Sequence, residues 1–295
     1  MLVLGITGDI GAGKSTVSSI IAESGATVIN ADLVAHEIWK RKEIILKAVE
    51  RWGDDIIISD DNIDSNMVAS LVFRDDKEYK WLCDTLHPLI RMEMEKKVMA
   101  LDGLIVVEIP LLFENGIPWW VDATMYVSAP YALRLERNKS RGWDDGDIAR
   151  RESFLFPSKE KMAKADIRVI NSGDIHSLRD ELINLSARLK DFANLSEISF
   201  TVPSKEQALE IASAALREDL VLDAKVKDVY LFRLEEVGRA EDDWEVRFLA
   251  FQKRYNAILD FLAPYRVSHG TLPPMKAFKR PGSLWKKYVS SEIRT

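Results

Sequence analysis

The octet GDIGAGKS, residues 8–15, decides the fold of this chain, because it matches the pattern G-x-x-x-x-G-K-S of a phosphate-binding loop. A short apolar run at residues 2–6 precedes the octet, and a segment with Val17, Ile20 and Ile21 on one helical stripe follows it. This order of strand, turn and helix is what phosphate binding requires. A chance match in a chain of this length has odds on the order of one in a hundred. The octet therefore predicts binding of nucleotide phosphates.

Each residue type in the octet has its own task at an anion. Glycines bring successive backbone N–H groups close to a phosphate, and the helix that begins at Lys14 adds its dipole. The Lys14 side chain adds a mobile positive charge, and the Ser15 hydroxyl is an oxygen ligand of the kind that Mg²⁺ prefers. The residues predicted to hold the nucleotide are Gly8, Gly11, Ala12, Gly13, Lys14, Ser15 and Thr16.

Length and composition exclude several classes of function. The chain has 295 residues, suited to one large or two ordinary domains, and 47% of them are hydrophobic. Its formal net charge of -6 gives no general attraction to nucleic acid or to anionic membranes. No apolar run approaches the roughly 20 residues that cross a bilayer, and no signal-peptide pattern precedes the octet. Cys83, the single cysteine, excludes an internal disulfide and is predicted to be a buried structural thiol. We expect a cytoplasmic protein.

Strands and helices are predicted to alternate over the first 190 residues. The predicted strands are short, apolar and without alternation: residues 2–6, 27–30, 104–109, 124–127 and 167–170. Such runs suit strands that are buried on both faces of a parallel sheet. The intervening segments are long enough for helices, so we predict a doubly wound α/β fold with its ligands at the carboxyl ends of the strands.

Two carboxylates follow predicted strands at that edge. Asp32, after the second strand, lies where a base would accept a proton from an attacking hydroxyl, or it caps the helix that carries His36. Position alone leaves these two alternatives even. Glu108 is placed to hold Mg²⁺ through water, as the acidic residue of a Walker B strand does. Glu114, a few residues further along the chain, is expected to cap a helix or to orient a neighbouring side chain.

Two more regions complete the first part of the chain. Residues 36–100 are predicted to be helical, and His87 precedes a proline there, which taken alone favours a helix boundary over a site. Basic residues gather between Arg134 and Lys164, interrupted by the acidic run at 144–147. We predict two helices joined by a mobile turn, forming a lid that brings cations to the γ-phosphate and excludes water. The alternative is a solvated helix face.

Several strings in this order resemble the dephospho-CoA kinase family, and the resemblance covers about residues 1–190. The strings are GITGDIGAGKST from Gly5, AD at Ala31, HPLIR from His87, PLLFE from Pro110, and AD followed by VINSG ending at Gly173. The first string is shared by many kinases, whereas HPLIR and PLLFE after it are far more specific.

The resemblance implies ATP-dependent phosphorylation of the ribose 3′-hydroxyl of dephospho-CoA, the last step of coenzyme A biosynthesis. By position it implies that Asp32 is the base facing that hydroxyl. Lys14, Arg137 and Arg141 would stabilise the transferring group, with ATP and Mg²⁺ as the cofactors. The family's acceptor-binding positions are here His87, Arg91, Leu111 and Leu112. Asn171 would lie near the base of ATP.

This chain departs from the family at two positions. The family often has glycine where this chain has Asp9, and a glutamine near the position of Leu155. An acidic side chain beside bound phosphates repels them if it points inward. We therefore expect Asp9 to point away from the phosphates.

Residues 191–196 are predicted to be a linker, and a second domain, residues 197–295, follows. Its elements have the order βαββαβ of a ferredoxin-like α+β fold: strand 197–202, helix from Ser204, strands 225–234 and 244–251 around a turn at Gly238, helix 255–263, and a strand within 268–278. The face shared by Trp244, Val246 and Phe248 is predicted to be the inner one.

This second part resembles the CutA divalent-cation tolerance family. The resembling residues are TVPS from Thr201, VYLFR from Val229, PYRV from Pro264, and Leu284, Trp285 and Tyr288. The resemblance implies a homotrimer. The cysteine that the family often has in its second strand is absent, with Asp223 and Ala224 nearby, so copper binding is not expected. His269 alone is predicted to be a loop residue.

Other functions are weighed against this one. The first is another P-loop small-molecule kinase that acts on a different hydroxyl. The second is a ligand or metal sensor whose C-terminal domain is the functional unit. A GTPase-like switch is disfavoured, because the chain lacks the guanine-reading signature N-K-x-D.

Overall fold

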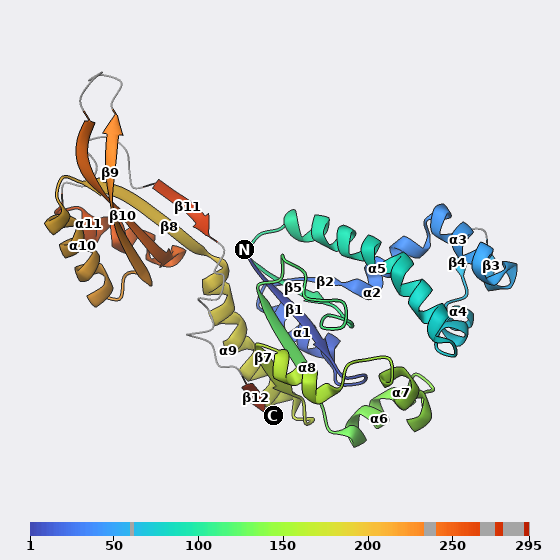
Figure 1. Ribbon diagram of the computed structural model, residues 1–295. Coiled ribbons are helices and arrows are strands. Elements are labelled where there is room, and N and C mark those ends of the chain that lie inside the picture. Colours follow the sequence, from blue (N-terminus) through green and yellow to red (C-terminus); the bar gives the residue numbers. More distant parts are fainter. Residues whose placement is uncertain (60–61, 233–239, 266–274, 280–291, 295) are drawn as a thin grey trace. The chain divides into compact units, whose positions relative to one another are not determined.

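The computed structural model describes residues 1–59, 62–232, 240–265, 275–279 and 292–294 (Figure 1). Contacts within the chain define two compact units. The first comprises residues 2–189 together with 283–295, and the second comprises Met1 with residues 190–282. The second unit is therefore inserted near the C-terminal end of the first.

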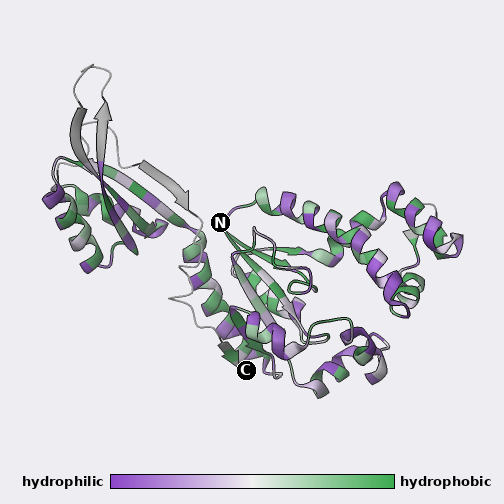
Figure 2. Ribbon diagram, in the orientation of Figure 1, coloured by the Kyte–Doolittle hydropathy of each residue, from purple (hydrophilic) through white to green (hydrophobic). Residues whose placement is uncertain are grey.

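The described residues of the first unit form a six-stranded parallel sheet with the order β12-β7-β6-β1-β5-β2. Its strands are β1 (Leu2–Gly8), β2 (Thr27–Asn30), β5 (Leu104–Glu108), β6 (Ala123–Ser128), β7 (Ile167–Ile170) and β12 (Glu292–Arg294). Every residue of β1, β5 and β6 is buried, as the apolar runs predict. These strands are among the hydrophobic parts of the ribbon in Figure 2. The predicted parallel α/β fold is confirmed, and β12 is an addition that the sequence did not indicate.

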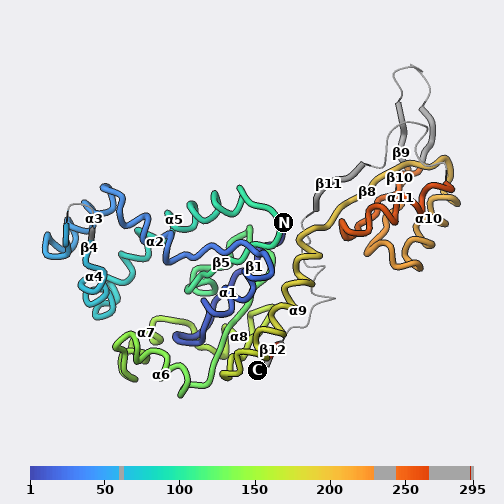
Figure 3. The backbone as a smooth tube through the Cα atoms, turned by 180° about the vertical axis from the view of Figure 1, so that it is seen from behind, coloured from blue at the N-terminus to red at the C-terminus, as the bar shows by residue number. Residues whose placement is uncertain are grey.

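Helices connect these strands. They are α1 (Lys14–Glu23), α2 (Ala31–Trp39), α3 (Lys42–Trp52), α4 (Ser65–Val72), α5 (Asp76–Met99), α6 (Tyr131–Lys139), α7 (Asp145–Glu152), α8 (Ser158–Lys164) and α9 (Ile175–Ala193). A short 3-10 turn (Asp54–Ile56) leads into a small hairpin of β3 (Ile57–Ser59) and β4 (Asn62–Ile63). Figure 3 shows α3, α4 and β3 gathered at the N-terminal end of α5.

Helix α1 and the two helices of the predicted lid follow from their side chains. The helix α1 buries Val17, Ile20 and Ile21, the stripe predicted from the sequence. Two helices are confirmed in the predicted lid, α6 and α7. The acidic run between them forms a capping box, because the Asp144 carboxylate accepts from the Asp147 N–H at 2.8 Å. The run therefore begins α7 instead of serving only as a turn.

The second unit has the predicted order βαββαβ. Its elements are β8 (Leu195–Val202), α10 (Lys205–Arg217), β9 (Asp223–Phe232), β10 (Ala240–Phe251), a 3-10 turn (Gln252–Arg254), α11 (Tyr255–Leu262) and β11 (Met275–Lys279). The sheet is antiparallel with the order β11-β8-β10-β9. The predicted linker at 191–196 is wrong, because α9 runs to Ala193 and β8 begins at Leu195. Gly238, His269, Leu284, Trp285 and Tyr288 lie outside the described residues.

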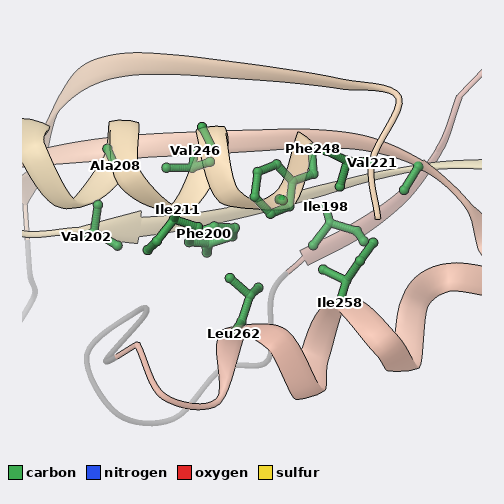
Figure 4. Packing of buried hydrophobic residues seen from close by; sticks show 13 residues of the cluster. Ile198, Phe200, Val202, Ala208, Ile211, Val221, Val246, Phe248, Ile258 and Leu262 are labelled. Carbon is green, nitrogen blue, oxygen red and sulfur yellow. The ribbon is translucent and has the colours of Figure 1, made fainter. Parts of the chain in front are cut away.

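The core of the second unit lies between its sheet and its two helices (Figure 4). Val246 and Phe248 are fully buried, and Trp244 packs against the same cluster, so the predicted inner face of β10 is confirmed. The rings of Phe200 and Phe248 meet edge to face with centroids 5.3 Å apart. The Ser204 hydroxyl caps α10 by accepting from the Gln207 N–H at 3.2 Å. This unit therefore has a hydrophobic core of its own.

Candidate active site

A cavity of about 1160 Å³ opens at the carboxyl ends of β1, β2 and β5 and extends to helices α2, α5, α6 and α7. Its volume is slightly above the roughly 300–1,000 Å³ of typical ligand pockets. The predicted site residues among those that line it are Gly8, Gly11, Gly13, Lys14, Ser15, Thr16, Asp32, His87, Arg91, Glu108, Leu111, Leu112, Arg137 and Arg141. The other two predicted residues, Ala12 and Asn171, are hydrogen-bonded to each other: the Asn171 side-chain amide donates to the Ala12 carbonyl at 2.9 Å.

Two glycines of the loop are needed for two reasons: their backbone conformation and the close approach of other segments. Gly11 and Gly13 have φ of 77° and 91°, which side chains disfavour. A Cβ at Gly11 would lie 2.4 Å from the Asn138 amide nitrogen, and one at Gly13 would lie 2.6 Å from that of Asn171. The helix α6 and the end of β7 thus pack so closely on the loop that only glycine fits.

Lys14 reaches across the loop that it follows. Its Nζ donates to the carbonyl oxygens of Gly8 and Asp9, each at 3.0 Å. Burial lowers the pKa of Lys14, and the nearby carboxylates, that of Asp9 first, oppose this change. The carbonyl oxygens of the loop therefore hold the ammonium group at the centre of the loop.

Ser15 and Glu108 form a pair of oxygen donors beside the loop. The Ser15 hydroxyl lies 3.3 Å from Oε2 of Glu108, and the Asn30 amide nitrogen lies 3.3 Å from the same oxygen. The strand register places Asn30 opposite Glu108. Hard oxygen donors fit Mg²⁺, which is usually held by one or two protein groups together with phosphates and water. Within the described residues, no three His, Cys, Asp or Glu side chains cluster as metal ligands.

Asn30, not Asp32, caps helix α2. Its Oδ1 accepts from the N–H groups of Asp32 at 2.8 Å and Leu33 at 3.3 Å. The alternative that Asp32 is the cap is therefore wrong, and its exposed side chain lines the cavity. Part of the residue is open to solvent, but the protein atoms around the carboxylate displace water from it and raise its pKa, while the charges of Lys14 and Arg141 lower it. Arg141 and Lys14 are thus close enough to influence this carboxylate.

The two predicted lid arginines have different surroundings. Arg137 donates to the carbonyl oxygens of Gly11 at 3.3 Å and Ala12 at 3.2 Å, and to the Asn171 amide oxygen at 3.3 Å. Arg141 donates to the Asn138 amide oxygen at 3.3 Å, and its guanidinium carbon lies 5.5 Å from the Trp143 ring centroid. Both arginines line the cavity, and Arg137 is hydrogen-bonded to the loop, whereas Arg141 is hydrogen-bonded to Asn138 of α6.

Helix α5 brings His87 and Arg91 to the other side of the cavity. The predicted helix boundary at His87 is wrong, because α5 continues through Pro88 to Met99. Burial lowers the pKa of His87, and its Nδ1 lies 3.0 Å from the Asn115 amide nitrogen. The imidazole is therefore neutral near pH 7 and acts as a hydrogen-bonding group.

Leu111 and Leu112 differ in exposure on the cavity wall. Leu112 is fully buried, whereas Leu111 is partly exposed. Cys83 also lines the cavity and is half-buried, so the predicted buried thiol is wrong in part. Burial raises the pKa of this thiol and keeps it protonated at neutral pH.

Sequence reasoning missed the aromatic surroundings of Arg151. Its guanidinium carbon lies 3.9 Å from the Trp143 ring centroid and 4.6 Å from that of Phe73, and all three residues line the cavity. Cation–π contacts of this kind join α7 to the segment after α4. Arg151 was only one member of a basic run, and no local pattern indicates which arginine meets an aromatic ring from a distant segment.

Comparison with known proteins decides the family. A family model described as dephospho-CoA kinase matches residues 2–177. The chain belongs to the dephospho-CoA kinase family. A dephospho-CoA kinase of Shewanella oneidensis is 34% identical over 191 residues, which cover 63% of this chain and 92% of that one. One of Methylococcus capsulatus is 36% identical and is covered to 96% of its length, with 64% of this chain. The chain is therefore a kinase.

Two solved structures resemble parts of this chain. The protein TT1252 of Thermus thermophilus has a TM-score of 0.55 and 30% identity, covering 64% of this chain and 97% of its own. Over the C-terminal part, CutA of Synechococcus elongatus has a TM-score of 0.25 and 18% identity, covering 29% of this chain and 80% of its own. A likeness at this level carries no assignment of function. Among the described residues, no helix has both the length and the apolar character that crossing a membrane requires.

Proposed function

We propose that this chain transfers the γ-phosphoryl group of ATP to the ribose 3′-hydroxyl of dephospho-CoA. The observation that carries the proposal is the position of Asp32. Its backbone N–H donates to Asn30, and its side chain lines the cavity. The charges of Lys14 and Arg141 both lower the pKa of its carboxyl group. A base and two cations around one cavity are the groups that transfer to a hydroxyl needs.

Different residues of the chain would act on ATP and on the acceptor. Bound ATP with Mg²⁺ supplies the phosphoryl group and part of the neutralising charge. Lys14 and backbone N–H groups of the loop would bind the phosphates, and Ser15 and Glu108 would hold the metal. Asp32 orients the acceptor hydroxyl and accepts its proton. Arg141 stabilises charge that develops during transfer, and Arg137 keeps the loop in shape.

The remaining predicted residues position the reactants. His87, Arg91, Leu111 and Leu112 would hold the acceptor on the side of the cavity opposite the loop. Asn171, bound to the Ala12 carbonyl, would lie near the base of ATP. These placements follow from the family's motifs together with the cavity in which the side chains meet.

An Asp32→Asn variant tests the mechanism. Removing a base that accepts the proton is expected to lower turnover of dephospho-CoA by about 10²–10⁴-fold, with the KM for ATP near the wild-type value. Asp180→Asn, an exposed position on α9, is the matched control. Wild-type turnover in the Asp32 variant would remove this residue from the mechanism.

We further propose that the first unit, residues 2–189 with 283–295, is the kinase domain and that the second unit, residues 190–282, serves assembly or regulation. The predicted bounds of 1–190 and 197–295 are thereby changed at the C-terminal end, because β12 pairs with β7 of the first unit. The homotrimer stays a prediction, as does the cytoplasmic location. Mass measurement of the full chain tests the trimer, and titration of the full chain with Cu²⁺ and with CoA tests a sensor role.

A further inference from the structure

Asp9, at a position in the phosphate loop where the family often has glycine, turns its side chain into the first unit. The residue is 6% exposed. Its Oδ1 accepts from the Tyr126 hydroxyl at 2.6 Å, and it also accepts from the Ser158 hydroxyl. Tyr126 belongs to β6, and Ser158 is the first residue of α8. The carboxylate therefore ties the loop to two elements that follow it by more than 100 residues.

The same short helix is held to the acceptor side of the cavity by a buried ion pair. Lys161 of α8 is 1% exposed, and its Nζ lies 3.1 Å from Oε1 of Glu114. The backbone N–H of Phe156, just before α8, donates to the same oxygen at 3.1 Å. Glu114 ends the segment PLLFE, whose leucines border the cavity. A buried pair tolerates little separation, because either charge left alone is strongly destabilising.

Helix α8 thus has one hydrogen bond to the phosphate loop and one ion pair to the acceptor segment. Ser158 and Lys161 lie within a single turn of this helix, so a displacement at Ser158 is expected to be passed on to Lys161. The backbone oxygen of Asp9 also accepts from Lys14 at 3.0 Å, a bond that an arriving phosphate would compete for. A small shift of the loop would therefore reach Glu114 through two polar contacts.

We propose that Asp9 is a positioning residue that couples nucleotide binding at the phosphate loop to acceptor binding at the PLLFE segment, acting through Ser158, α8 and Lys161. The coupling concerns the two substrates of the proposed function and rests on it. Binding of one ligand is then expected to change the affinity for the other reciprocally, in the range of about 5–150-fold that couplings of this kind show.

The test measures binding and not turnover. The dissociation constant of dephospho-CoA is determined by calorimetry on the full chain, without and with a saturating non-hydrolysable ATP analogue, and the ratio of the two values reports the coupling. Ser158→Ala removes the bond to Asp9, and Asp9→Ala removes the carboxylate. Lys161→Met breaks the pair with Glu114. Lys164→Met is the control, because Lys164 lies on the same helix but its exposed side chain pairs with Glu160.

We expect a ratio of at least about fivefold for the wild type and for Lys164→Met. The ratio should fall close to one in the other three variants. Melting temperatures identify a variant that does not fold, and Ser158→Ala, which removes a single hydroxyl, then decides. A ratio of one in the wild type, or an unchanged ratio in Ser158→Ala, would overturn the coupling. Absence of any dephospho-CoA binding to the wild type would instead overturn the proposed function.

Discussion

The two sides of the cavity differ in how far their polar side chains are already bound. On the nucleotide side, Lys14 and Arg137 hydrogen-bond to loop carbonyls, and Asn171 holds the loop from behind. On the acceptor side, the described residues give the side chains of Asp32 and Arg91 neither a hydrogen bond nor an ion pair. The difference teaches that the cations of the phosphate loop are held in place by the protein itself, whereas the side chains of Asp32 and Arg91 are left to interact with a ligand. Groups held in place by the protein reduce the cost of ordering them on binding.

Apart from Asp32→Asn, the largest effect is expected on the nucleotide side, from Lys14→Met. This change removes the charge that lies at the centre of the loop, and we expect kcat to fall by about 10³-fold, the upper end for loss of one stabilising donor. Steady-state kinetics with ATP and dephospho-CoA measure it. Lys97→Met, whose lysine pairs with Glu37 on the surface, should behave as the wild type. A decrease in kcat of less than tenfold in Lys14→Met would contradict the importance of the charge held by the loop.

Variants of the two lid arginines distinguish the two sides of the cavity by their kinetic effects. Arg141→Met is expected to lower kcat by about 10²-fold with little change in the KM for ATP, because Arg141 lines the cavity and its charge acts on Asp32. Arg137→Met should mainly raise the KM for ATP, since Arg137 supports the loop. Arg179→Met, where the arginine pairs with Glu23 on the surface, is the control. Equal effects on both parameters in both variants would remove the distinction.

The pH profile sharpens the comparison on the acceptor side. Burial raises the pKa of Asp32 above that of an exposed aspartate, about 4. The base acts when ionised, so kcat/KM should fall as the pH drops through this raised value. The positive charge of Arg141 lowers the pKa, and Arg141→Met is therefore expected to move the acid limb to higher pH. Profiles of the wild type and the variant that share the same acid limb would show that another group titrates.

The smallest effect on turnover is expected at the edge of the sheet. Ile293 of β12 is 4% exposed and pairs in register with Val169 of β7, the strand that leads to Asn171. Ile293→Asp should lower the free energy of unfolding by about 2–4 kcal/mol and raise the KM for ATP a few-fold, with kcat almost unchanged. Denaturant unfolding and kinetics measure both. Ile175→Asp, at an exposed isoleucine of α9, should be close to neutral. Equal stability of the two variants would mean that β12 adds nothing.

Local patterns predicted the strands and the phosphate loop, because short buried runs and the octet at residues 8–15 carry their signal within a few residues. The role of Asp32 was open from sequence, since an aspartate at this position suits a helix cap as well as a base, and only the structure shows that Asn30 caps α2. His87 was misplaced because a proline usually ends a helix, whereas α5 tolerates Pro88.

Contacts between distant segments could not be predicted. The three residues of β12 have no periodicity of their own, and their pairing with β7 joins positions more than 120 apart in the chain. Arg151 between two aromatic rings, and Asp9 on the Tyr126 hydroxyl, depend in the same way on how the fold brings segments together. Such contacts involve residue types that are common throughout the sequence.

The central claim is tested most directly by identifying the product. The full chain is incubated with ATP, Mg²⁺ and dephospho-CoA, and the ADP and CoA formed are quantified, with adenosine and simple sugars as competing acceptors in parallel. The account predicts equal amounts of ADP and CoA, phosphorylated at the ribose 3′ position, and little transfer to the other acceptors. ADP formed without CoA, or faster phosphorylation of adenosine or a sugar, would contradict it.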